Sequence, residues 1–317
     1  TVTATAAGQI DSANIVTING SAILNLIGDN TLAGLIFRDD GGGSTGSTVN
    51  SNFGVLTLNG NVTSTTANPG STSTIVGRVD FGSVMRTLDI SPTTFNGQEL
   101  AALLSDFNLQ GVVGTTGGIK KTGDGVLQFN GVDIYTGPTQ VDAGRIQPGT
   151  TNGGSRFSTL TLNGTSTALN LNNVSTIWGG LSGTGFVTNS GTTAQTLTVG
   201  YNGADTTFSG NFYRFNDAVA NAVALAKIGS GTLTFDSSGA ASNTTGALTV
   251  NRGAVRFADL GTSSFEIATL VVNEGGTLIL DNSNATSSAN VNNRLAGGPL
   301  NLSGGTFNVL GRDGTAT

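Results

Sequence analysis

The side chains that could do chemistry in this 317-residue chain are mostly carboxylates, from sixteen Asp and three Glu. Hydrolysis of a glycosidic bond generally uses two carboxylates about 5–10 Å apart. Asp39 and Asp40 are the only adjacent acidic pair, and no Asp-x-Asp occurs. Histidine is absent, which removes the commonest general base and the commonest zinc ligand. We therefore expect no catalytic site and no cofactor; a polysaccharide-degrading enzyme, with carboxylates gathered from distant segments, remains an alternative.

Two further motifs could hold a ligand. Asp39 and Asp40 could ligate calcium, but two neighbouring carboxylates fall short of the about 6–8 oxygens that calcium takes. We interpret them as a solvated corner and expect no metal site. Gly123-Asp124-Gly125 has the glycine spacing of a phosphate-binding loop, but a strand-like run follows it. Without a helix N-terminus there, we expect no nucleotide site.

Aromatic and basic residues bear on carbohydrate and nucleic-acid binding. Residues 212–215 (Phe-Tyr-Arg-Phe), with Trp178 and Tyr201 upstream, could form a surface that stacks on sugars. We favour the competing interpretation, an aromatic ladder inside or capping the fold. Three lysines and ten arginines are scattered along a chain of net charge −6, so no basic stripe is available to nucleic acid. Cysteine is absent, which excludes disulfides and thiolate metal sites.

The elements that must position these side chains are short strands. Residues 118–146 hold three brief apolar runs separated by corners that contain glycine; the runs are 126–129, 134–136 and 139–141. Strands this short, with glycine at each corner, are typical of a β-solenoid or a hairpin meander. Seven Asn-Gly pairs occur in the chain, and Asn-Gly readily takes the positive φ that a tight corner requires.

The segment from 118 to 146 recurs later in the chain. Residues 121–129 match 227–235 at a spacing of 106, and 136–146 match 245–255 at a spacing of 109. We predict an all-β fold, an elongated parallel β-helix (β-solenoid) with Gly and Asn corners. It would run as one continuous solenoid over 1–317, with N-terminal coils in 1–117 and two diverged repeats of about 106–110 residues in 118–317.

One segment departs from the strand pattern. Leu100, Leu103, Leu104 and Phe107 have the spacing of a helix face, and Asn96 precedes them as an N-cap. The spacing predicts a short helix over 97–107 on the flank of the solenoid. We favour a lid over apolar coil surface for this helix, with a docking element for another subunit as the alternative.

The two copies resemble the autotransporter-associated β-strand repeat, also called the passenger-associated transport repeat. Lys121–Phe129 is similar to the first half of that repeat and Tyr135–Ile146 to the second. The later copy departs from it, with Ile228 in place of Thr, Arg252 in place of Ala and no Tyr before Thr245. The resemblance implies a secreted or surface-displayed bacterial β-solenoid. It implies no reaction, because such passengers serve as adhesins, scaffolds or stalks.

The ends of a solenoid expose unpaired backbone groups that another strand can join, and neither end of this sequence shows a polar cap. The alternating, uncharged run Thr1, Val2, Thr3, Ala4, Thr5, Ala6 and Ala7 is the segment we expect to take part in such joining. The chain begins without Met, and we expect it to be a processed piece of a longer precursor.

These observations favour an extracellular or cell-surface structural protein, a solenoid building block of a fibre, filament or sheath that associates with itself or with neighbouring repeats. An adhesin stalk that binds glycans is the alternative from another class. We expect no nucleic-acid partner. No apolar run reaches the about 18–20 residues that a membrane helix needs, so we expect no membrane span in this segment.

Overall fold

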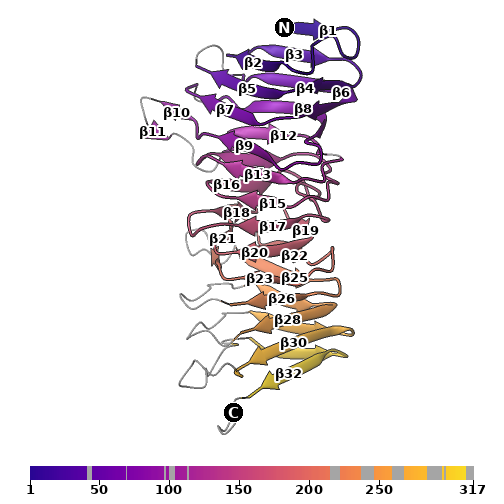
Figure 1. The fold of residues 1–317 in the computed structure, drawn as a ribbon. Helices are drawn as coiled ribbons and strands as arrows, with labels where there is room; N and C mark the ends of the chain where they lie inside the picture. The colour runs from indigo at the N-terminus through magenta and orange to yellow at the C-terminus, as the bar shows by residue number, and fades with distance from the viewer. Residues whose placement is uncertain are drawn as a thin grey trace. The chain divides into compact units, whose positions relative to one another are not determined.

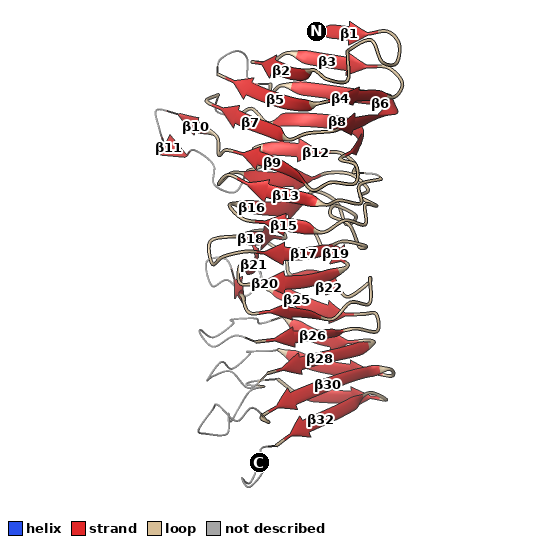
Figure 2. Ribbon diagram, viewed as in Figure 1, coloured by secondary structure: helices blue, strands red, loops and turns tan. Residues whose placement is uncertain are grey.

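In the computed structural model of the chain, the described residues form 32 β-strands and no helix (Figures 1 and 2). The structure describes all residues except 41–44, 69, 96–97, 100–103, 113, 215–221, 237–245, 259–267, 284–294, 296–297 and 312–317. The chain divides into two compact units, Thr1–Ser158 and Thr159–Thr317. The expected all-β parallel β-solenoid is confirmed within each unit, since every strand pairs in parallel with the strand of the next coil, apart from one small hairpin in the first unit.

The first unit consists of two parallel sheets. One sheet contains β1 (Val2–Ala4), β3 (Ile23–Leu26), β4 (Asn30–Leu32), β6 (Thr48–Leu58), β8 (Ser73–Asp80), β12 (Phe107–Leu109), β14 (Val126–Phe129) and β16 (Arg145–Pro148). The other contains β2 (Ile15–Asn19), β5 (Gly34–Asp39), β7 (Val62–Thr66), β9 (Arg86–Ile90), β13 (Ile119–Thr122) and β15 (Thr139–Val141). β10 (Thr94–Phe95) and β11 (Gln98–Glu99) form the hairpin.

The second unit consists of three parallel sheets. The longest contains β17 (Thr159–Leu162), β20 (Gly180–Gly183), β23 (Thr206–Phe208), β26 (Thr232–Phe235), β28 (Gly253–Phe257), β30 (Gly276–Asp281) and β32 (Thr306–Leu310). The next contains β19 (Thr176–Trp178), β22 (Gln195–Val199), β25 (Val223–Lys227), β27 (Ala247–Val250), β29 (Thr269–Asn273) and β31 (Leu300–Ser303). The third contains β18 (Ala168–Asn170), β21 (Phe186–Asn189) and β24 (Asn211–Arg214).

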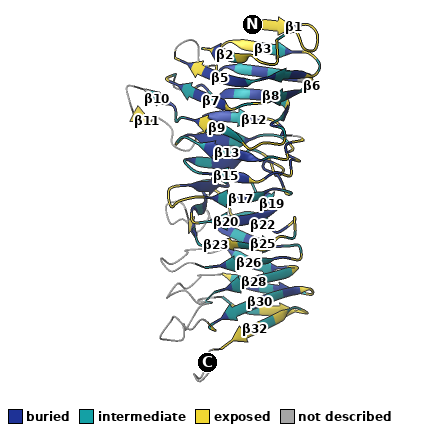
Figure 3. Cartoon of the chain, in the orientation of Figure 1, coloured by how far each residue is buried: buried dark blue, intermediate teal, exposed yellow. Residues whose placement is uncertain are grey.

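Alternation along each strand builds the core, because successive side chains point to opposite faces of a sheet. In the second unit one inward ladder consists of leucines in register, namely Leu197, Leu225, Leu248, Leu270 and Leu300. A second ladder is aromatic, with the rings of Phe235 and Phe257 stacked at 5.3 Å. Figure 3 shows the strands of the inner coils mostly as buried or intermediate and the strands of the end coils as more exposed. Stacked ladders of this kind bury apolar side chains with contacts only between neighbouring coils.

The Asn-Gly corners serve two different physical needs. Gly20, Gly164 and Gly203 have positive φ, as predicted. Gly60 and Gly131 do not, and close approach of the neighbouring coil explains them instead. A Cβ at Gly60 would lie 1.9 Å from the Ala33 carbonyl oxygen, and a Cβ at Gly131 would lie 1.3 Å from the Gln110 carbonyl oxygen. Only glycine permits either arrangement.

The helix predicted over 97–107 is absent from the described part of that segment, and the prediction was wrong there. The whole of β11 and the first residue of β12 fall inside the segment, and both elements are strands; residues 97 and 100–103 lie outside the described residues. Phe107 is fully buried and Leu104 is 65% exposed. The helical spacing therefore combined an inward strand residue with a residue of an exposed loop.

Residues 134–136, predicted as a strand, also take an irregular path. Their backbone still bonds to the preceding coil, with the Ile134 amide on the Val112 carbonyl and the Thr136 amide on the Thr115 carbonyl. Tyr135 is buried there, and its hydroxyl lies 2.6 Å from the Thr139 hydroxyl. These hydrogen bonds give the backbone amides and the tyrosine hydroxyl their partners, so the corner needs no regular strand pairing.

Candidate functional site

The feature that recurs in both sequence copies is a lysine side chain that points into the solenoid. Lys121 lies on β13 and Lys227 on β25, each at an inward position of its strand. Their exposed fractions are 0% and 1%. Lysine is almost never fully buried unless its ammonium group finds partners, so the surroundings of each amine decide what it does.

Each lysine amine donates to three backbone carbonyls at one corner of the solenoid. Lys121 Nζ lies 2.9 Å from the Thr122 oxygen, 2.5 Å from the Gly123 oxygen and 3.2 Å from the Ala143 oxygen. The first two carbonyls belong to its own coil and the third to the next coil. The ammonium group therefore ties the corners of two consecutive coils together. We call this group the Lys121 corner.

The Lys227 corner repeats this arrangement in the second unit. Lys227 Nζ lies 2.6 Å from the Ile228 oxygen, 3.1 Å from the Gly229 oxygen and 3.4 Å from the Arg252 oxygen. These three residues occupy the sequence positions of Thr122, Gly123 and Ala143 in the first copy. The two copies therefore share a hydrogen-bond pattern as well as a sequence.

Burial dominates the electrostatics of both amines. It lowers the pKa of Lys121 to about 8, against the opposing attraction of Asp106, Asp124 and Asp89. Burial likewise lowers the pKa of Lys227 to about 8, with Asp205 opposing. An amine of this pKa would be a usable nucleophile in an open site. Here neither side chain is accessible, so the arrangement supports a structural tie and not a reaction on a bound substrate.

Two buried aspartates accept hydrogen bonds that connect consecutive coils. Asp106 accepts hydrogen bonds at Oδ1 from the Thr93 amide and hydroxyl, both at 2.7 Å, and at Oδ2 from the Val126 amide at 2.7 Å. Asp133 accepts from the Val112 amide at 2.7 Å and the Gly154 amide at 2.8 Å. The donors of Asp133 belong to the coil before it and the coil after it. The donors of Asp106 are Thr93, which lies between β9 and β12 in the same coil, and Val126 of the next coil.

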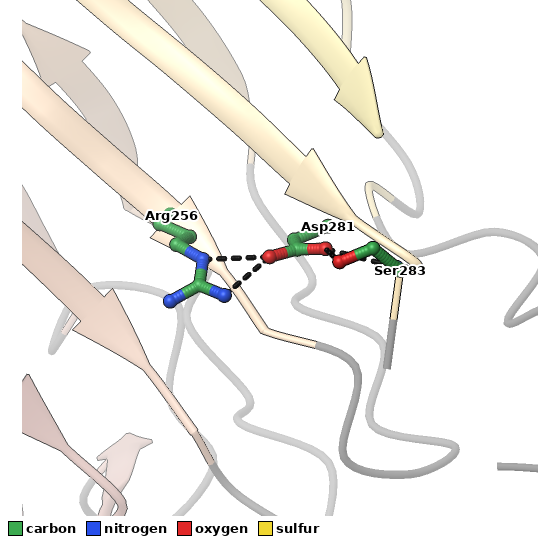
Figure 4. Close-up of polar contacts among 3 residues, drawn as sticks. All are labelled: Arg256, Asp281 and Ser283. Atoms are coloured by element: carbon green, nitrogen blue, oxygen red, sulfur yellow. Dashed lines mark hydrogen bonds and ion pairs between the residues drawn. The ribbon is translucent and has the colours of Figure 1, made fainter. Parts of the chain in front are cut away.

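Asp133 and Asp281 show opposite electrostatic outcomes. Burial raises the pKa of Asp133 to about 7, although its two backbone hydrogen bonds oppose the change. Burial also acts to raise the pKa of Asp281, but the hydrogen bonds from Ser283 and the bond and charge of Arg256 outweigh it and lower that pKa. Figure 4 shows Arg256 of β28 on one side of the Asp281 carboxylate and Ser283 on the other. Arg256 Nε lies 2.8 Å from Oδ2, and the Ser283 hydroxyl 2.6 Å from Oδ1.

The segment Thr1–Ala7 is only partly a strand. Val2–Ala4 forms β1, which pairs in parallel with β3, and Thr5–Ala7 form a turn-like extension. β1 is the first strand of its sheet, and its outer edge has no partner strand among the described residues. Val2 is 67% exposed, and Ile15 of β2, the first strand of the other sheet, is 62% exposed.

The candidate ligand-binding residues of the sequence are dispersed in the structure. Asp40 is exposed, but Asp39 is completely buried, so the interpretation of both as a solvated corner was wrong for Asp39. Among the described residues, no group of three or more Asp, Glu, His or Cys is placed to hold a metal ion. Gly123 belongs to the Lys121 corner, and β14 follows it, as the interpretation against a nucleotide site required.

The aromatic residues divide between the interior and the surface. Trp178 and Phe212 are buried, at 1% and 2% exposure, so neither can stack on an external sugar. Tyr201 and Tyr213 are 44% and 41% exposed. Tyr213 makes an edge-to-face contact with Phe186, with ring centres 5.8 Å apart. Phe215 lies outside the described residues.

The lysine corners were missed at the sequence level, although a signal was present. Lys121 follows Ile119 by two residues, and Lys227 follows Leu225 by two. Side chains two apart share a face of a strand, so both lysines had inward parity. A charged residue at an inward position, present in both copies, predicts a buried group that must find backbone partners.

The family comparison identifies the same two segments. Residues 119–147 and 225–257 match the passenger-associated transport repeat. The resemblance stated for the sequence is thereby confirmed, and each match includes one lysine corner. No curated protein and no solved structure matches the chain. None of the described residues forms a helix long and apolar enough to cross a membrane.

Proposed function

We propose that this chain is a non-enzymatic structural segment of an autotransporter passenger-type domain, secreted or displayed on the cell surface. The observation that carries this proposal is the pair of passenger-associated transport repeats, each folded into successive parallel coils. The family supports the surface location, and the parallel coils support a role as scaffold or stalk. Immunolabelling of intact cells that express the tagged parent protein tests the location; label only in lysed cells would contradict it.

The way the coils pack supports a role as a structural scaffold. Each coil contacts mainly its neighbours, so coils can be added without redesigning a central core. Backbone ties such as the Lys121 and Lys227 corners fix one coil on the next. We propose that the coils continue as one solenoid through residues 1–317.

We further propose that the end coils associate with other coils, either neighbouring segments of a longer chain or a second copy. Parallel strands with an open edge are templates for strand addition. Val2 and Ile15 are 67% and 62% exposed in the first coil, and Leu302 and Val309 are 52% and 49% exposed in the last strands. In this proposal Thr1–Ala7 forms part of the contact, and filaments or sheaths are its extended form.

The experiment places a charge in the exposed apolar surface of the first coil. Val2→Lys and Ile15→Lys would repel an incoming strand edge, and Val132→Lys is the matched control because Val132 is a comparably exposed valine, at 60%. We expect the wild type and the control to form regular assemblies in negative-stain micrographs and in sedimentation, and the two end variants to remain dispersed. Equal assembly of all four proteins, or of none, would refute self-association through this end.

Glycan binding is a second candidate with one observation in its favour. The Tyr213 ring is half exposed and is held edge-to-face by Phe186, which is a preorganised apolar face of the kind that stacks on sugars. Binding to a glycan array that is lost on Tyr213→Ala, but kept on Tyr201→Ala, would support an adhesin. An array without any bound glycan would remove this candidate.

A further inference from the structure

The Asn-Gly corners differ in whether the backbone amide of the glycine is held by a hydrogen bond. Asn-Gly is the sequence at which asparagine most readily loses its side-chain amide, because glycine has no side chain to shield its backbone nitrogen. That nitrogen can attack the preceding asparagine only when no hydrogen bond holds its proton. The fold therefore decides which of the pairs is reactive. Six of the seven pairs lie within the described residues, beginning at Asn19, Asn59, Asn130, Asn152, Asn163 and Asn202.

In four of these six pairs the glycine amide donates a hydrogen bond, at distances from 2.7 to 3.0 Å. The donors and their acceptors are Gly20 with the Arg38 carbonyl, Gly153 with the Thr150 carbonyl, Gly203 with the Gly200 carbonyl and Gly164 with the Thr184 hydroxyl. Each bond has to open before the glycine nitrogen can react, so the fold protects these four asparagines.

The other two pairs lack this protection. Neither the Gly60 amide nor the Gly131 amide has an acceptor among the described residues. Asn130 is half-buried, and its Oδ1 packs so closely on Gly149 that a Cβ there would lie 1.7 Å from it. Asn59, in contrast, is exposed at the end of β6. Asn59 therefore combines an exposed side chain with an unprotected glycine amide.

We propose that Asn59 is a site of spontaneous modification, at which the folded protein converts asparagine to aspartate and isoaspartate. The Gly60 nitrogen gives its proton to hydroxide or water and forms a bond to Cγ of Asn59. The bond from Cγ to the side-chain nitrogen breaks, and that nitrogen takes a proton from the solvent and leaves as ammonia. Water then opens the cyclic imide at either carbonyl, which gives aspartate or isoaspartate. The net change is the exchange of ammonia for water, with no oxidation or reduction.

The two products have different effects on the coil. Both add one negative charge at an exposed position of a chain whose net charge is −6. Isoaspartate also lengthens the backbone by one carbon directly before Gly60. A Cβ at Gly60 would already lie 1.9 Å from the Ala33 carbonyl oxygen, so the corner between β6 and β7 has no room for a longer path. We expect isoaspartate at this position to lower the urea midpoint of unfolding, and the variant Asn59→Asp to keep it.

The test follows each Asn-Gly pair by peptide mass spectrometry while the full chain is incubated at mildly alkaline pH, folded and in urea. Asn19 is the matched control, because it is also exposed but the Gly20 amide is bonded to Arg38. In the folded chain we expect Asn59 to react about two- to twelvefold faster than Asn19, which corresponds to the about 0.5–1.5 kcal/mol of one hydrogen bond. In urea we expect similar rates. Equal rates in the folded chain, or the same ratio in urea, would overturn the proposal.

Two glutamine variants assign the site. Asn59→Gln keeps a side-chain amide but places it one carbon farther from the backbone, where ring closure by the Gly60 nitrogen is much slower. Asn19→Gln is the matched control. On native isoelectric focusing of the incubated chain, we expect Asn59→Gln to lose the earliest acidic band and Asn19→Gln to keep it. An acidic band that appears equally early in Asn59→Gln would place the reactive asparagine elsewhere and refute the assignment.

Discussion

The two lysine corners predict an unusual dependence of stability on pH. The folded-state pKa of Lys121 and of Lys227 is lowered from 10.5 to about 8. A group whose pKa is depressed on folding contributes stability above its unfolded pKa, and that contribution is lost as pH falls through the folded pKa. We therefore expect the free energy of unfolding to rise between pH 8 and pH 10.

The magnitude follows from the size of the shift. A lowering of about 2.5 pKa units corresponds to about 3 kcal/mol for each lysine when the whole window is crossed. Between pH 8 and pH 10 about 2 kcal/mol of this appears for each lysine, because the unfolded side chain is not yet fully deprotonated. Tyr135 limits the pH range of the experiment to values up to about 10. Its pKa is raised by burial, so its contribution to stability is lost as pH rises above the unfolded value of about 10.

Urea unfolding at several pH values, followed by far-ultraviolet circular dichroism, measures this dependence. Lys121→Met and Lys227→Met each remove one contribution, and the double variant removes both. Lys120→Met is the matched control, because Lys120 lies one residue away, is partly exposed and pairs with Asp142 at 2.8 Å. We expect the control to keep the wild-type slope and the double variant to lose it. A wild-type stability that is flat or falls from pH 8 to pH 10 would refute the reasoning.

Two further predictions concern the corner glycines and the buried aspartates. Gly144 has φ +67, and a Cβ there would lie 2.5 Å from the Gly125 carbonyl oxygen, so Gly144→Ala should lower the free energy of unfolding by at least about 2 kcal/mol. Ala143→Arg should change it by less than about 0.5 kcal/mol; similar urea midpoints for the two would contradict this account. Asp133, with a pKa raised from 3.8 to about 7, contributes stability below pH 4 that is lost as pH rises to 7. Relative to Asp133→Asn, the wild type should lose about 3 kcal/mol between pH 4 and pH 7, and parallel pH profiles in urea unfolding would refute it.

The fold was predictable because its two determinants are local. Alternation of apolar and polar residues over four or five positions specifies which face of a strand points inward. The recurrence of 121–129 as 227–235 indicates that one type of coil is repeated along the chain. The helix over 97–107 failed because spacing within one segment does not reveal the register with its neighbours. Phe107 is inward only because β12 pairs with Ser73–Ile75 on one side and with Leu127–Phe129 on the other.

The buried polar groups were less predictable than the fold. Asp39 and Asp40 are indistinguishable by composition, and only the inward parity shared with Leu35 and Phe37 separates them. That parity depends on where the strand begins, which the sequence leaves uncertain by one or two residues. A shift of one residue exchanges the buried and exposed faces. The inward or outward position of an aspartate also does not show which groups donate hydrogen bonds to it. The donors of Asp133 lie on other coils, 21 residues away in either direction.

The lysine corners explain which departures from the repeat the second copy can tolerate. Ile228 stands where the first copy has Thr122, and Arg252 stands where it has Ala143. All four contribute only a backbone carbonyl to the lysine amine, so the tie does not depend on their side chains.

The glycines at the same corners are under a stricter requirement. Gly123 and Gly229 have φ +72 and +68, and Gly144 and Gly253 both have φ +67. A side chain at any of these positions would be strained by its backbone angle and would also meet a neighbouring carbonyl oxygen at 2.5 Å or less. In both copies the lysine amine thus reaches three carbonyl oxygens at corners whose close packing leaves room only for glycine.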